Sequence, residues 1–99
     1  MKIIICGAGL SGRAIAEKLS QIGNEVTIID SSKRLIEKLG SKLDIRGIVG
    51  HGAHPDILGE AGAKDAEMLI AVTHSDEINM MSCQVAHSLF EVPKRIARV

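Results

Sequence analysis

The sequence predicts an α/β fold: a doubly wound, Rossmann-like parallel sheet with helices on both faces. Short apolar runs alternate with amphipathic runs along the whole chain, which is typical of strands joined by crossover helices. A glycine-rich segment with glycines at positions 7, 9 and 12 lies directly between the first apolar run and the first amphipathic run. Right-handed crossovers and this glycine-rich first turn favour five strands in the order 3-2-1-4-5, in three αβα layers.

The first part of the chain predicts two strand–helix units. Residues 2–6 (KIIIC) form a continuous apolar run, as expected of a strand that is buried on both faces. A helix over about 11–22 follows, and it ends at Gly23. Residues 25–30 (EVTIID) form the second strand, and the next helix lies within 31–40, between a serine N-cap and a glycine.

The second part continues the alternation as far as a fifth strand. Residues 44–50 (DIRGIVG) predict a weaker third strand, and Pro55 suits the first turn of a short helix. A fourth strand over 68–73 leads into a helix over 75–90, which opens with a serine and two acidic residues. Residues 95–99 form the last strand. The helix over 75–90 carries one apolar stripe, made of Ile78, Met81, Val85 and Leu89.

Length and composition limit the class of protein. A chain of 99 residues is one domain, and the uncovered last strand suggests a piece of a longer protein. The formal net charge is zero, which argues against nucleic acid or anionic lipid as a direct partner. No apolar run approaches the roughly 18 residues of a membrane span. Cys6 and Cys83 show no paired spacing, so we expect reduced, buried thiols.

The glycine-rich segment predicts a phosphate-binding turn. In the pattern G-x-G-x-x-G, Gly7 allows the tight turn, Gly9 lets a pyrophosphate approach the backbone, and Gly12 lets the helix pack close to the sheet. The free N–H groups and the dipole of the helix N-terminus attract phosphate. The remaining residues of the predicted contact are Ala8, Leu10 and Ser11.

An acidic residue at the end of the second strand makes the pattern more specific. Asp30 lies 18 residues after Gly12, where a carboxylate accepts hydrogen bonds from the two ribose hydroxyls. The same carboxylate repels a 2′-phosphate, which favours NAD(H) over NADP(H). ATP and ADP present the same ribose and phosphates, so the pattern does not separate them from a dinucleotide.

The carboxyl ends of the other strands supply the remaining candidate contacts, because ligands of such sheets bind at that edge. His51 follows the third strand, where it could lie against the adenine. Thr73 and His74 end the fourth strand beside the glycine turn, and Arg98 ends the fifth strand within reach of a phosphate or ribose. We expect no metal site and no catalytic residue. Neither cysteine has an activating neighbour, and the histidines lack the arrangement of a zinc site; they are His51, His54, His74 and His87.

Three segments together resemble the N-terminal nucleotide-binding lobe of the RCK/KTN family, the peripheral regulatory subunits of potassium uptake systems. They are KIIICGAGLSGRAIAEKLSQIGNEVTIID, GHGAHPDILGEAGAKDAEMLIAVTHSDEINMMSCQVAHSLF and RIARV. The stretch AGAKDAEMLIAVTHSDEINM is the most specific, since dehydrogenases in general do not share it. The resemblance covers essentially all of residues 1–99, which would then be the RCK N-terminal domain of a longer protein.

The resemblance implies a cytoplasmic homo-oligomer, a dimer or ring, held at the inner face of the membrane by a TrkH-like potassium channel subunit. It implies that NAD(H) or an adenine nucleotide binds at residues 7–11, Asp30, Thr73, His74 and Arg98, and that the bound ligand gates the channel without covalent chemistry. Many relatives carry an acid where His51 stands. The alternative interpretation is the cofactor-binding half of an NAD-dependent dehydrogenase. A dehydrogenase would need substrate-binding and proton-transfer residues from a further domain.

Overall fold

The computed structural model describes residues 1–40 and 44–98. Its centre is a five-stranded sheet with the order β3-β2-β1-β4-β5, in which every neighbouring pair is parallel. This confirms the predicted fold class and strand order. The strands are β1 (Lys2–Cys6), β2 (Glu25–Asp30), β3 (Arg46–Val49), β4 (Met68–Ala71) and β5 (Lys94–Ala97).

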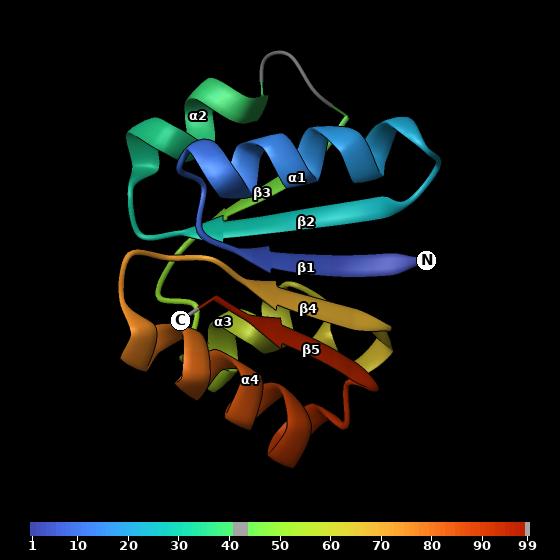
Figure 1. The fold of residues 1–99 in the computed structure, drawn as a ribbon, viewed down its shortest axis with the longest axis vertical. Coiled ribbons are helices and arrows are strands. Elements are labelled where there is room, and N and C mark those ends of the chain that lie inside the picture. Colours follow the sequence, from blue (N-terminus) through green and yellow to red (C-terminus); the bar gives the residue numbers. More distant parts are fainter. Residues whose placement is uncertain (41–43, 99) are drawn as a thin grey trace.

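Helices cover both faces of the sheet. Figure 1 shows α1 and α2 on one side of the strands and α3 and α4 on the other, which makes three layers. Among the described residues, no helix has the length and apolarity needed to cross a membrane. The helices are α1 (Leu10–Gln21), α2 (Lys33–Gly40), α3 (Pro55–Glu60), the short 3₁₀ helix η1 (Ala63–Asp65) and α4 (Asp76–Phe90).

The side chains of strand β1 contribute to the apolar core on both faces of the sheet. Successive side chains of a strand point to opposite faces. Ile3 and Ile5 therefore join the cluster under α1 and α2, whereas Ile4 and Cys6 join the cluster under α3 and α4. All four are at most 1% exposed. Burying a side chain of this size stabilises a fold by about 1.5–3 kcal/mol, so this strand anchors the whole sheet.

Strands β1 and β2 have the predicted bounds, and the bounds of several other elements differ by one or two residues. Pro55 opens α3, and the Ser75 hydroxyl accepts the Ile78 N–H as the N-cap of α4. Strand β4 ends at Ala71 instead of residue 73, because the N–H of Thr73 donates to the Asn79 side chain, 2.8 Å away, instead of to a strand.

Helix α1 and strands β3 and β5 also shift slightly from their predicted bounds. Helix α1 begins one residue earlier than predicted, at Leu10, and ends before Ile22, which is 66% exposed. Strand β3 is shorter than predicted, at Arg46–Val49. Strand β5 begins one residue earlier, at Lys94, and the predicted end of this strand at residue 99 lies outside the described residues.

The predicted apolar stripe of α4 matches its buried face only in part, because Ile78 and Val85 are half-buried and Val85 packs against the core, whereas the other two residues are exposed. Met81 is 53% exposed and Leu89 is 60% exposed. The α4 residues that are buried against the sheet are small or polar, namely Asn79, Ser82 and Ala86. Small side chains let a helix approach the sheet closely, and the two polar ones meet loop backbone groups that need hydrogen-bond partners.

Candidate functional site

A pocket of about 730 Å³ opens at the carboxyl-terminal ends of the strands. This size lies within the usual range for small-molecule sites. It is the place expected for a ligand of an open α/β sheet, at the switch point between β1 and β4. Ten of the eleven predicted contact residues line it: Gly7, Ala8, Gly9, Leu10, Ser11, Asp30, His51, Thr73, His74 and Arg98. The eleventh, Gly12, packs beneath the turn, and the ligand-binding role of all eleven stays a prediction.

The three glycines of the turn between β1 and α1 meet different surroundings. Gly7 has φ +114°, and a Cβ on it would lie 2.9 Å from the backbone of Val72. A Cβ on Gly12 would lie 1.8 Å from the carbonyl oxygen of Gly7. Gly9 has an ordinary φ of −74°, and a Cβ on it would meet only the His74 side chain, at 3.9 Å. The fold therefore requires glycine at positions 7 and 12, whereas at position 9 the missing side chain leaves open space.

The carboxylate of Asp30 is fixed beside this turn by two backbone amides. Its Oδ2 accepts the N–H of Ala8 at 2.8 Å, and its Oδ1 accepts the N–H of Ser32 at 2.8 Å. Each carboxylate oxygen can accept a further hydrogen bond, so both remain able to receive ribose hydroxyls. The N–H of Ala8 is already used, which leaves the amides from Gly9 onward, at the start of α1, to face a phosphate.

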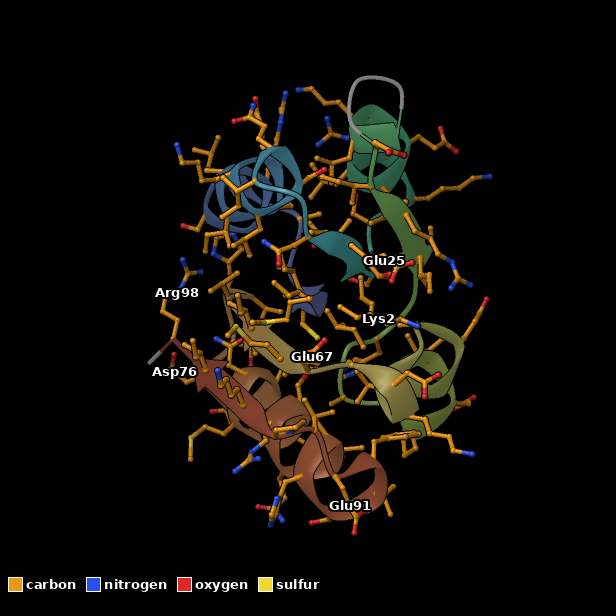
Figure 2. All side chains as sticks on the ribbon, turned by 90° about the vertical axis from the view of Figure 1, so that its right-hand side faces the viewer. Lys2, Glu25, Glu67, Asp76, Glu91 and Arg98 are labelled. Carbon is orange, nitrogen blue, oxygen red and sulfur yellow. The ribbon has the colours of Figure 1, made fainter. Side chains whose placement is uncertain are left out.

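Arg98 bridges the two sides of the pocket mouth. Its guanidinium donates to the Ser11 hydroxyl and to the carbonyl oxygens of Val72 and Thr73, each at 2.9 Å. Figure 2 shows this side chain extending from the end of β5. A cation is thus held beside the N-terminus of α1, where both attract a negatively charged ligand.

Two basic side chains of the pocket were not predicted. Arg13 and Lys38 line it together with Arg98, against the single carboxylate of Asp30. Arg13 could have been found from its place next to Gly12 in the first turn of the helix. Lys38 has no such signal, because only the fold brings the end of α2 to the pocket. The excess of positive charge favours a ligand that carries more than one negative charge.

The loop after β3 presents an imidazole to the pocket. His51 is stacked on His54, with ring centroids 4.4 Å apart, and its Nδ1 accepts the N–H of Ala53 at 3.1 Å. This bond directs the proton of the neutral ring to Nε2. No group of three or more histidine, cysteine, aspartate and glutamate side chains within residues 1–40 and 44–98 is placed to hold a metal ion.

The cysteines differ in their access to solvent and reagents. Burial raises the pKa of the Cys6 thiol to about 12. Burial also raises the pKa of Cys83, against the nearby charge of Arg95, although this residue is only partly buried. The thiolate is the nucleophile, so neither cysteine suits nucleophilic chemistry near neutral pH. The prediction that both thiols are buried is correct for Cys6 and wrong for Cys83.

Thiol labelling should separate the two cysteines. With iodoacetamide at pH 8, we expect the native protein to be alkylated slowly at Cys83 and not at Cys6, and at both sites in urea. The positions are read by peptide mass spectrometry, with Cys83→Ser as the control that leaves no accessible thiol in the native protein. Because folding raises the pKa of Cys6, its contribution to stability is present below about pH 9 and declines as the pH rises towards 12. Labelling of native Cys6 at a rate equal to Cys83 would contradict this assignment.

Comparison with known proteins identifies the family. The TrkA-N domain model matches residues 3–99. The chain is 56% identical over 99 residues to the Trk system potassium uptake protein TrkA of Azorhizobium caulinodans, and it spans 22% of the length of that relative.

Two solved structures have the same fold. The TrkA-N domain of the inner membrane protein ybaL from Escherichia coli matches with a TM-score of 0.84 and 22% identity, over 98% of this chain and 71% of that one. The Shewanella denitrificans Kef CTD in AMP bound form matches with a TM-score of 0.80 and 28% identity, over 97% of this chain and 57% of that one. The fold, the glycine turn and the family match agree, and the chain belongs to the TrkA-N domain family.

Proposed function

We propose that this chain is a regulatory domain of a potassium uptake system and that it binds NAD(H) or an adenine nucleotide such as ATP or ADP. The observation that carries the proposal is the position of the Asp30 carboxylate beside the open N-terminus of α1, in one pocket. The family, and the name of the relative that is 56% identical, support the potassium system. The AMP-bound Kef domain supports an adenine nucleotide.

Each part of such a ligand has a counterpart in the pocket. The amides from Gly9 to Gly12 and the guanidinium of Arg98 would hold the phosphates, and Asp30 would accept the ribose hydroxyls. The exposed face of the His51 ring would lie against the adenine. The open space at Gly9 fits a pyrophosphate, because a side chain there would fill the position that the phosphate needs.

Regulation would follow from linkage. A ligand that binds two arrangements of an assembly with different affinity shifts the population between them. A tenfold difference in affinity supplies about 1.4 kcal/mol for each site. In this proposal residues 1–99 act as one domain of a longer, cytoplasmic homo-oligomer. It is held at the inner face of the membrane by a TrkH-like channel subunit, and it performs no covalent chemistry.

Calorimetric titration of NAD, NADH, ATP and ADP against the same sample tests the proposal. We expect at least one of them to bind in a one-to-one ratio, and we expect Gly9→Ala to weaken that binding about tenfold or more because its methyl group enters the phosphate position. Thermal unfolding of Gly9→Ala should stay close to wild type, since nothing within 3.9 Å opposes the new side chain.

Gly59→Ala is the matched control, because its Cβ would meet Phe90 at an ordinary 3.6 Å, away from the pocket. This variant should bind as the wild type does. If the wild type binds none of the four nucleotides, the proposed function is rejected. If a nucleotide binds but the protein oxidises NADH while reducing ketone or 2-oxo acid substrates, the regulatory role is replaced by a dehydrogenase role.

A further inference from the structure

Helix α4 carries two polar side chains on the face that packs against the sheet. Asn79 and Ser82 are both 0% exposed, and they stand three residues apart on this face. Burying a polar group is unfavourable unless it finds hydrogen-bond partners, and an apolar side chain could fill the same space. The partners of these two residues therefore indicate what they do.

Asn79 joins the ends of two strands at the pocket. Its Oδ1 accepts the N–H of Thr73 at 2.8 Å and the Thr73 hydroxyl at 2.6 Å. Its Nδ2 donates to the carbonyl oxygen of Thr73 at 3.2 Å and to that of Arg98 at 3.0 Å. Both partners line the pocket, and Arg98 in turn reaches Ser11 at the start of α1. One amide thus fixes the phosphate side of the proposed site.

Ser82 holds the opposite side. Its hydroxyl donates to the carbonyl oxygen of Gly52 at 2.9 Å, and the Cys6 thiol approaches the same oxygen at 3.8 Å. Gly52 directly follows His51, the residue proposed to lie against the adenine. A Cβ on Gly52 would lie 3.0 Å from the Cys6 sulfur, so this loop is packed tightly against the sheet and α4.

We infer that Asn79 and Ser82 are positioning residues through which α4 aligns the two halves of the nucleotide site: Asn79 acts on the phosphate half through Thr73 and Arg98, and Ser82 acts on the base half through Gly52. This inference rests on the proposed function. It has the consequence that any displacement of α4 changes the affinity for the ligand, since both halves are attached to this one helix.

Three probe ligands separate the two roles: ADP, adenosine without phosphate, and ribose 5-phosphate without base. They are titrated by NMR into the purified chain and its variants, since chemical shifts detect weak binding. Asn79→Ala should weaken ADP and ribose 5-phosphate about tenfold and change adenosine by less than about threefold. Ser82→Ala should weaken ADP and adenosine about threefold to tenfold and leave ribose 5-phosphate unchanged.

The control is Gln84→Ala on the exposed side of α4, where the Gln84 amide donates to the Ser88 hydroxyl at 2.6 Å; it should change none of the three affinities. If Asn79→Ala loses its cooperative melting transition, Asn79→Asp replaces it and should give the same pattern, because it keeps the acceptor and the size but loses the donor to the carbonyl oxygens of Thr73 and Arg98. An equal loss for all three ligands, or no loss, overturns the inference. If the wild type binds no probe at all, the proposed function is rejected, and the inference that rests on it is rejected as well.

Discussion

Gly12→Ala should be among the most destabilising single substitutions in this protein. The new Cβ would lie 1.8 Å from the carbonyl oxygen and 2.8 Å from the carbonyl carbon of Gly7, and 3.4 Å from the Val72 side chain. The two closest atoms belong to the backbone, so no flexible side chain can move aside. Gly7 cannot shift easily either, because its N–H is bonded to the carbonyl of Ile29 at 2.8 Å. To remove this clash, α1 would have to move away from the sheet.

Overpacking commonly costs about 1–3 kcal/mol, and we expect about 3 kcal/mol or more where backbone meets backbone. For a domain of this size, that loss lowers the melting temperature by about 12 °C or more. Urea unfolding followed by circular dichroism measures it. Gly9→Ala is the control in the same turn, because it meets only His74 at 3.9 Å and should unfold near the wild-type midpoint. Equal midpoints for the two variants would show that the close approach of Gly7 and Gly12 is not required.

Asp30→Ala should have the largest effect on ligand binding. The substitution removes two acceptors for the ribose hydroxyls, and hydrogen bonds to a charged group contribute about 1.5–3 kcal/mol each. We expect the affinity for NAD or ADP to fall roughly a hundredfold, which corresponds to about 2.7 kcal/mol. The fold should survive, because the hydrogen bonds from the amides of Ala8 and Ser32 are only partly buried, so that water can replace the carboxylate.

The same variant should also change selectivity. A carboxylate at this position repels a 2′-phosphate, so the ratio of NAD to NADP affinity should approach one in Asp30→Ala. Glu37→Ala is the control for lost negative charge, since Glu37 is exposed on α2, where it pairs with Lys33 at 3.7 Å. Unchanged affinity in the calorimeter for Asp30→Ala would reject the role of Asp30, and a shift in selectivity in Glu37→Ala would assign the effect to net charge.

The fold could be predicted because the spacing of apolar residues identifies the strands and helices, and because their order along the chain indicates the topology. Five short apolar runs separated by helical segments leave few topologies, and the glycine turn indicates where the strand order reverses, between β1 and β4. The pocket could be predicted for a related reason: parallel strands place their carboxyl ends at one edge, so Asp30, Thr73 and Arg98 had to come near Gly9.

The inward face of α4 could not be predicted from hydrophobicity. Apolar spacing selected the stripe that contains Met81 and Leu89, but these side chains are largely exposed. Asn79 and Ser82 face the sheet because their partners are loop carbonyls and amides from residues 52, 73 and 98, which are distant in the sequence. The sequence alone does not identify such partners. It does not show either that Lys38 lines the pocket, since only the fold brings α2 there.

The two hydrogen bonds that fix the Asp30 carboxylate have a consequence for the rate at which a ligand binds. One carboxylate oxygen accepts a hydrogen bond from the glycine turn and the other from the residue that precedes α2, so the geometry proposed to bind ribose exists before any ligand arrives. A preformed site loses little conformational entropy on association. Stopped-flow mixing should therefore give observed rates that rise linearly with nucleotide concentration, without the plateau of a slow rearrangement.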